Sequence, residues 1–149
     1  MEVLARARRA LRADGDPFVF VTVPAFNFLW SPWDDMERHK RRYTEASLHR
    51  VLRAVGLEPV RSTYFFFPLF FAALGVKALR SARGVVQRAV GAPETEPARN
   101  IRDMTEAKNV PLLNQLMLAV TSPERSWLPA RRIPLGTSLL TIARPRRVA

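Results

Sequence analysis

The sequence contains no cysteine among its 149 residues, so disulfides, thiolate zinc sites and cysteine nucleophiles are all excluded. Its two histidines, His39 and His49, are ten positions apart and lack the helical spacing that holds a metal, so we expect no metal site. No two of the six glycines are separated by a single residue, which excludes a dinucleotide-binding fingerprint and a phosphate loop. No serine stands in a Gly-x-Ser-x-Gly motif, so hydrolase chemistry has no recognisable nucleophile.

Long apolar runs are also scarce. The N-terminal residues alternate charged with small apolar side chains and lack the apolar centre of a secretory signal. Residues 64–76 carry no charge, but these thirteen residues fall short of the roughly 20 that span a bilayer. We expect a helix here that is either buried or lies in a membrane interface. A cytoplasmic protein is expected, with peripheral membrane contact as an option.

Positive charge is abundant. Twenty-four Lys and Arg against thirteen Asp and Glu give a net charge of +11, which favours nucleic acid, anionic lipid or acidic substrates as partners. Because no nucleic-acid recognition module accompanies this charge, we do not expect nucleic acid binding. The hydrophobic content of 48% and the charged content of 25% are those of a globular chain, and the length fits one domain.

Apolar periodicity and turn residues predict an α/β layer fold. The expected helices lie at residues 2–12, 44–55, within 64–83 and 111–120, and the expected strands at 18–23, 58–66 and 138–143. The first strand is a continuous β-branched and aromatic run, typical of a strand buried on both faces between helices. Residues 91–109, with two prolines and no apolar period, predict a flexible surface loop.

The irregular segment 25–42 between the first strand and the second helix is rich in aromatic and acidic side chains. Its aromatic residues would either wall an apolar substrate pocket or form a flap that closes the core; they are Phe26, Phe28, Trp30 and Trp33. Its acidic residues, Asp34, Asp35 and Glu37, would serve as an acid and base pair or form local ion pairs with the cations that follow. Ion pairing is the simpler interpretation.

Residues 39–44, with the sequence His-Lys-Arg-Arg-Tyr-Thr, form the densest polar cluster. In a functional interpretation, Arg41 or Arg42 clamps an acidic substrate group while His39 or Tyr43 handles a proton. In a structural interpretation, Thr44 caps the following helix, Tyr43 packs beneath it, and the cations are solvated. The sequence leaves both interpretations open.

Several of these segments together resemble the second half of class I S-adenosylmethionine-dependent methyltransferases. The resemblance rests on the strand Val19–Val23 followed by Pro24-Ala25-Phe26, on the block at 39–44, and on residues 110–114 and 134–140. It is closest to a bacterial group in which a His-x-Arg-Arg-Tyr-Thr segment follows the fifth strand. The resemblance covers nearly the whole chain except residues 85–105, and residues 39–44 are its most specific part.

The resemblance implies a partial Rossmann-like methyltransferase fold and a single incomplete domain over residues 1–149. The three strands correspond to family strands 5, 6 and 7, so it implies a small mixed sheet in the order 5-7-6, flanked by helices. In the family, strand 7 runs antiparallel between the other two. Strand 18–23 would lose its usual neighbour, strand 4, and expose an apolar edge that favours self-association or a complementary N-terminal half.

The resemblance also implies where the chemistry would lie. Family members bind S-adenosylmethionine on the first half of the fold, so no cofactor-binding residue can be carried over, and we expect this chain alone not to bind it. The substrate-facing candidates lie beyond the carboxyl ends of the strands; they are Phe26, Trp30, Trp33, His39, Arg41, Arg42 and Tyr43. No catalytic residue is assigned, because methyl transfer can proceed by positioning alone.

The alternative is a non-catalytic basic protein that binds an anionic membrane surface. Residues 64–83 would supply apolar and cationic side chains, and the arginine-rich C-terminal residues would add further charge.

Overall fold

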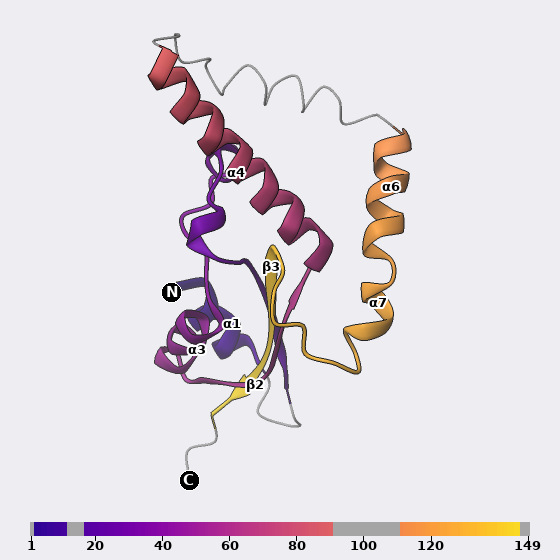
Figure 1. Cartoon of the computed structure of the whole chain (residues 1–149). Helices are drawn as coiled ribbons and strands as arrows, with labels where there is room; N and C mark the ends of the chain where they lie inside the picture. The colour runs from indigo at the N-terminus through magenta and orange to yellow at the C-terminus, as the bar shows by residue number, and fades with distance from the viewer. Residues whose placement is uncertain (1, 12–16, 91–110, 147–149) are drawn as a thin grey trace.

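The computed structural model describes residues 2–11, 17–90 and 111–146 (Figure 1). The helices are α1 (Glu2–Ala10), the short 3-10 helix η1 (Asn27–Leu29), α2 (Pro32–Met36), α3 (Glu45–Ala54), α4 (Phe67–Val90), α6 (Pro111–Thr121) and α7 (Glu124–Trp127). The strands are β1 (Val19–Pro24), β2 (Leu57–Phe65) and β3 (Ser138–Pro145). The predicted α/β order is confirmed, with three short helices added, whereas the loop predicted at 91–109 lies outside the described residues.

The strands form one sheet in the order β1-β3-β2, with β3 antiparallel to both neighbours. Val19 pairs with Ala143 in one ladder, and Tyr64 pairs with Leu139 in the other. The first and second strands therefore run in the same direction, one on each side of the last strand. The order with an antiparallel central strand is the expected one, but because both pairings are antiparallel the sheet is antiparallel and the expectation of a mixed sheet is wrong.

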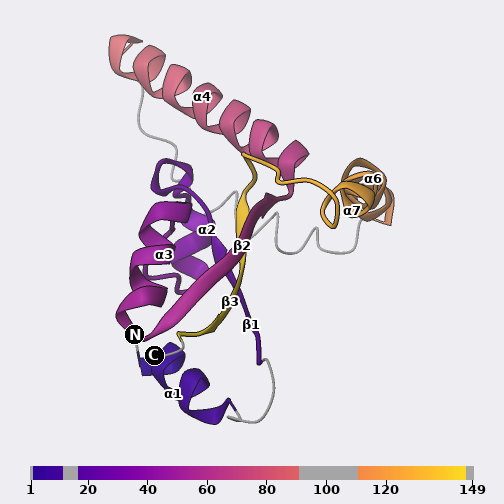
Figure 2. The ribbon, with the colours of Figure 1, turned by 90° about the horizontal axis from the view of Figure 1, so that it is seen from below.

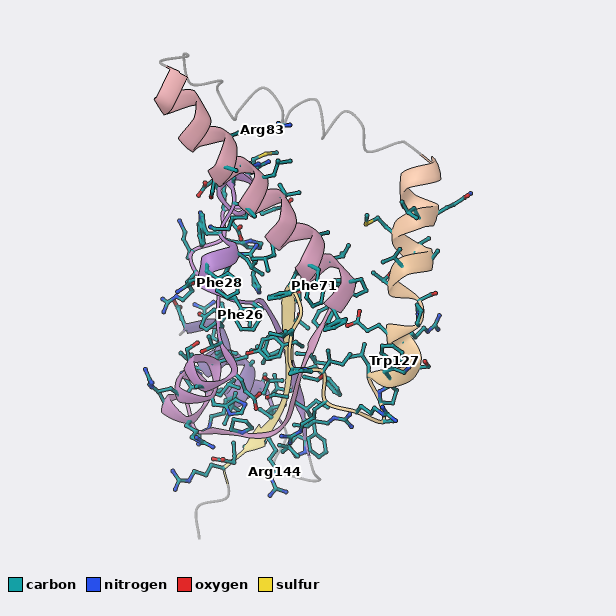
Figure 3. The ribbon with its side chains drawn as sticks, in the orientation of Figure 1. Phe26, Phe28, Phe71, Arg83, Trp127 and Arg144 are labelled. Atoms are coloured by element: carbon teal, nitrogen blue, oxygen red, sulfur yellow. The ribbon has the colours of Figure 1, made fainter. Side chains whose placement is uncertain are left out.

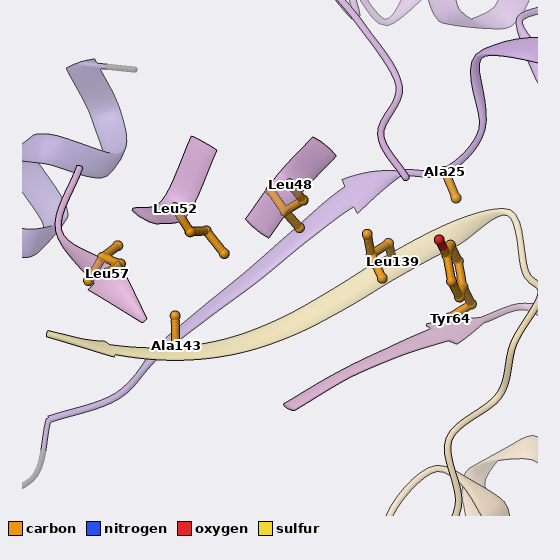
Figure 4. Packing of buried hydrophobic residues seen from close by; sticks show 7 residues of the cluster. All are labelled: Ala25, Leu48, Leu52, Leu57, Tyr64, Leu139 and Ala143. Carbon is orange, nitrogen blue, oxygen red and sulfur yellow. The ribbon is translucent and has the colours of Figure 1, made fainter. Parts of the chain in front are cut away.

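The core lies on the face of the sheet that α3 covers (Figure 4). Thr44 begins this helix as an N-cap, and its hydroxyl accepts a hydrogen bond from the Ser47 amide while the Ser47 hydroxyl accepts one from the Thr44 amide. The helix places two leucines against the sheet, and the buried apolar cluster comprises Ala25, Leu48, Leu52, Leu57, Tyr64, Leu139 and Ala143. The N-cap predicted at Thr44 is thus confirmed.

The prediction that the first strand is buried on both faces is wrong. The valines at positions 19, 21 and 23 pack against the core, but on the opposite face Phe20 is 68% exposed and Thr22 is also exposed. The helices α1, α2 and α3 lie on one side of the sheet, as Figure 2 shows. Within the described residues, no helix covers the Phe20 face of β1.

Helix α4 leaves β2 and passes over the end of the sheet where β1 and β2 finish (Figures 1 and 2). Its beginning is fixed by Glu124 of α7, whose carboxylate accepts hydrogen bonds from the amides of Phe66 (2.9 Å) and Phe67 (3.1 Å). A carboxylate at a helix N-terminus satisfies free amides and complements the helix dipole. The helix begins within the predicted range of 64–83 and extends beyond residue 83. None of the described helices has the combination of length and apolar character that crossing a membrane requires.

Gly136 allows β3 to begin close to the end of β2. A Cβ atom at this position would lie 2.2 Å from the carbonyl oxygen of Phe65, so the neighbouring backbone would have to shift. We predict that Gly136→Ala lowers the free energy of unfolding by at least about 2 kcal/mol, measured by urea denaturation.

Gly75→Ala is the matched control, because a Cβ atom at Gly75 meets nothing within 4 Å on helix α4. It should leave stability unchanged or raise it by up to about 1 kcal/mol, since alanine favours a helix. Equal losses in the two variants would contradict the packing described at Gly136.

Candidate functional site

The segment between β1 and α3 is organised by an ion pair between Asp34 and Arg42. Asp34 is completely buried, and the Arg42 side chain is 12% exposed. The guanidinium donates from Nε to Oδ1 of Asp34 at 2.8 Å and from a terminal nitrogen to Oδ2 at 2.9 Å. Its other terminal nitrogen donates to the carbonyl oxygen of Ala25 at 2.9 Å. This bidentate geometry fixes the orientation of the guanidinium and also compensates the buried charge of Asp34.

Three further hydrogen bonds complete the shell around the Asp34 carboxylate. The amide and the hydroxyl of Ser31 both donate to Oδ2, and Nδ1 of His39 lies 3.2 Å from Oδ1. Burial alone would raise the pKa of Asp34, but the hydrogen bonds from Arg42, Ser31 and His39 outweigh burial and hold the pKa below its ordinary value. Asp34 is therefore ionised at neutral pH, and the segment is built around its charge.

The ion-pair interpretation of the acidic stretch is confirmed at Asp34. Asp35 accepts a hydrogen bond from Nε1 of Trp30 at 3.2 Å, and Glu37 is exposed. Arg42 uses Nε and both terminal nitrogens within the protein, so it orders this segment; the expected clamp on an acidic substrate group would have to rely on Arg41 instead. His39 likewise faces Asp34 with one ring nitrogen, while its side chain stays 39% exposed.

Tyr43 ties the segment to the end of β1. Its amide donates to the carbonyl of Pro24 at 2.8 Å and its carbonyl accepts from the amide of Phe26 at 2.9 Å. Its side chain packs against the core, as the structural interpretation predicted. Arg41, which is exposed, lies with its guanidinium carbon 5.9 Å from the centre of the Tyr43 ring. Arg41 thus presents a cation to solvent beside an aromatic ring.

The aromatic side chains of the segment join the ends of β1, β2 and α4. Phe26 stacks on Tyr64 with ring centres 4.9 Å apart, and Phe70 of α4 meets both Phe26 (5.7 Å) and Phe28 (6.1 Å) edge to face. Phe26 adopts a positive φ of 57°, an uncommon conformation that turns the chain here. Phe26 therefore closes the end of the core, whereas Phe28 remains 49% exposed (Figure 3).

The structure brings the candidate residues together in one segment beyond the carboxyl end of β1, but only some of them face solvent. The backbone of Trp33 is part of α2, and its side chain lies outside the described residues. Phe26, Arg42 and Tyr43 face the protein. Arg41, Phe28 and the partly exposed His39 and Trp30 remain available to a ligand.

Sequence reasoning missed the residues that other elements contribute to this region. The Tyr64 hydroxyl accepts the Glu45 amide at 3.0 Å, and burial raises the pKa of Tyr64. Phe70 provides the aromatic platform beneath Phe28. Only the aromatic content of residues 64–71 signals such a contact, because the pairing between distant segments depends on the fold.

A second polar cluster lies between α3 and the sheet. The Nε2 atom of His49 lies 2.7 Å from the Ser62 hydroxyl, which in turn lies 2.8 Å from the Thr141 hydroxyl. Ser62 is 3% exposed and Thr141 is fully buried. A substrate has no access to this serine, so the cluster satisfies polar groups within the core rather than forming a nucleophile.

A metal site requires several ligating side chains close together. The described residues contain no group of three acidic or histidine side chains that could hold a metal ion. The four described glycines end α3 (Gly56), lie within α4 (Gly75 and Gly84) or pack against Phe65 (Gly136). No protein-family model, curated protein or solved structure matches the chain.

Removing the buried charge tests the role of Asp34. We predict that Asp34→Asn lowers the free energy of unfolding by about 3 kcal/mol at neutral pH, because the mostly buried Arg42 loses its counter-charge. Since the folded-state pKa of Asp34 is lowered, its stabilisation is present above the ordinary carboxyl pKa and is lost as pH falls through the folded-state value. The difference between wild type and variant should therefore shrink below about pH 4.

The matched control is Glu37→Gln, which removes an exposed carboxylate from the same segment. It should change the free energy of unfolding by less than about 0.5 kcal/mol. Urea unfolding of the two variants between pH 3 and 7 makes the comparison. An Asp34→Asn variant as stable as wild type at neutral pH would show that the buried pair does not hold this segment.

Proposed function

We propose that this chain is the acceptor-side half of a class I S-adenosylmethionine-dependent methyltransferase and acts with a complementary segment that carries the donor site. The observation that carries the proposal is the strand arrangement β1-β3-β2 with an antiparallel central strand. This is the order that the sequence resemblance implies for family strands 5, 7 and 6. The complementary segment would be part of a longer chain or a separate polypeptide.

The outer edge of β1 supports this proposal. The Ala25 amide donates to the carbonyl of Thr137, and this pair continues the register of the β1–β3 ladder. Because the main-chain groups of every second residue in an antiparallel pair point to the same neighbour, those of Val21 and Val23 also point toward β3. The intervening residues, Phe20 and Thr22, direct theirs away from it. Tyr43 pairs with the edge just beyond the end of β1, and the rest of the edge has no strand beside it in the described part of the chain. An apolar edge of this kind is a template for another strand.

The open face of the sheet supports it as well. Phe20 and Thr22 are opposite Ile142 and Leu140 in the register, so these four side chains share one face. Phe20 and Thr22 are exposed, and Leu140 and Ile142 are only partly buried. A sheet in an α/β domain buries both faces under helices, and a complementary segment would supply the layer that covers this one.

The acceptor would bind beyond the carboxyl ends of β1 and β2, where ligands bind in open α/β sheets. The segment 25–43 lies there, held in place by the Asp34–Arg42 pair. The exposed or partly exposed side chains of Phe28, Trp30, His39 and Arg41 would contact the acceptor. Phe26, Arg42 and Tyr43, which face the protein, would order the segment. Bringing an acceptor close to an activated methyl group supplies most of the required catalysis without a side-chain base.

Titration calorimetry with S-adenosylmethionine tests the proposal. We expect no saturable heat with this chain alone and saturable binding when it is co-expressed with the polypeptide encoded directly upstream of it. That upstream DNA should encode a strand followed by a glycine-rich turn. Tight binding by the chain alone, or no binding by the combined polypeptide, would overturn the proposal.

A charge placed on the β1 edge tests whether the complementary segment pairs with this chain at that edge. Phe20→Lys should weaken S-adenosylmethionine binding by the combined polypeptide at least about tenfold, because a lysine on an edge blocks strand pairing. The melting temperature of the chain alone should stay unchanged, since Phe20 is 68% exposed. Val3→Lys adds the same charge to an exposed position of α1 and should leave binding intact. Equal binding by both variants would locate the junction elsewhere.

A further inference from the structure

Helix α4 carries an apolar stripe that is exposed to solvent. At about 100° per residue, Phe71, Leu74, Ala78 and Ala82 fall on one side of the helix, with Leu79 beside them. All five are exposed, and Leu79 is 54% exposed. Phe70, on a different side, packs against Phe26 and Phe28 and fixes which way the helix faces.

Three cations of α4 whose side chains are described lie off the stripe, on a part of the helix surface that also carries apolar residues such as the exposed Val76. Arg80 lies opposite the stripe, and Lys77 and Arg83 lie to either side of it, all exposed. The sequence of α4 contains no acidic residue. Long cationic side chains that flank an apolar stripe can extend past it and reach charged groups at the boundary between an apolar phase and water.

We propose that α4 docks in the interface of an anionic phospholipid bilayer. Its apolar stripe would enter the region between headgroups and acyl chains, and Lys77 and Arg83 would contact the anionic headgroups from its two sides. Arg80, on the opposite side of the helix, would add to the electrostatic attraction. The helix lies in the plane of the membrane rather than across it, because none of the described helices is long and apolar enough to span one. This proposal does not depend on methyl transfer.

Charge complementarity favours a bilayer over another protein or a second copy of the chain. A second copy packed on the stripe would bring its own Lys77 and Arg83 beside those of the first, and these like charges would repel, whereas an anionic membrane attracts them. A narrow stripe with cations on both flanks suits a planar surface whose negative charge surrounds the inserted side chains. The net charge of +11 attracts the whole chain toward the same surface.

Vesicle flotation tests the proposal with the complete chain. The protein should float with vesicles of phosphatidylglycerol and phosphatidylcholine at about 50 mM salt. Its binding should fall at about 0.5 M salt, because salt screens the attraction between the cations and the anionic headgroups. Pure phosphatidylcholine vesicles should bind it much more weakly. Leu74→Gln with Leu79→Gln, and separately Lys77→Gln with Arg80→Gln and Arg83→Gln, should each lower the apparent affinity at least about tenfold.

Matched controls distinguish the contribution of α4 to membrane binding from the contribution of the net charge of the chain. Val3→Gln with Val60→Gln removes exposed apolar side chains elsewhere, and Arg9→Gln with Arg50→Gln and Arg125→Gln removes the same net charge elsewhere. Both controls should retain most of the binding. Failure of the wild-type chain to bind at low salt, or equal losses in the control and α4 variants, would overturn the proposal.

A fluorescent label gives a second readout that does not rely on a loss of binding. Because the chain has no cysteine, Ala78→Cys on the stripe and Ala46→Cys on α3 each create a single labelling site at an exposed helical position. An environment-sensitive dye at position 78 should shift its emission to shorter wavelength on anionic vesicles, while the dye at 46 should not. Sedimentation without lipid tests the alternative: self-association lost in Leu74→Gln with Leu79→Gln, and no shift at 78, would assign the stripe to a second copy.

Discussion

Strand β3 is the element on which the described structure depends, because both other strands hydrogen-bond to it and not to each other. Its side chains at Leu139, Thr141 and Ala143 are fully buried beneath α3. The strand comes last in the chain, so the long-range pairings that hold β1 and β2 can form only after residues 138–145 are in place. Gly136 allows this strand to approach the end of β2 closely.

Because β3 is central, β1 and β2 form the two edges of the sheet, and these edges differ in how far they are covered. On the far side of β2, the carbonyl of Ile133 accepts the Tyr64 amide, and the Ile133 amide donates to the Thr63 hydroxyl, so that edge is partly covered. Among the described residues, the outer edge of β1 has no comparable cover beyond the contact with Tyr43. At the end of the sheet, the Asp34–Arg42 pair fixes the segment 25–43, and α4 passes above it. If both proposals hold, the acceptor-side segment lies close to the helix that contacts the membrane.

Much of this architecture follows from local sequence signals. Thr44 at the start of α3, Gly56 after it and the apolar runs of the three strands identify these elements without any tertiary information. The apolar run of β1 led to the wrong prediction that both faces of this strand are buried. The sequence of a strand shows how apolar its residues are, but it does not show whether a helix in these residues covers the second face. The short helix α2 was missed since five residues with one proline carry too little periodicity.

The candidate site was less predictable than the fold. Residues 39–44 identify a dense polar cluster, but its chemistry depends on which cation meets Asp34, and that choice depends on the path of the chain between β1 and α3. Cations before a helix N-terminus oppose the helix dipole, and the buried carboxylate of Asp34 explains why Arg42 is nevertheless placed there. The stacking of Phe26 on Tyr64 joins a residue just beyond β1 to a residue of β2, and a pattern along one strand does not reveal it.

Amide hydrogen exchange along β1 tests the central claim that this strand is an open edge completed by another segment. In the isolated chain at low concentration, the amides of Val21 and Val23 should be protected by β3, whereas those of Phe20 and Thr22 should exchange almost freely. Adding the complementary segment should protect Phe20 and Thr22 as well. Equal protection of all four amides in the isolated chain, or continued fast exchange of Phe20 and Thr22 in the complete assembly, would contradict the account.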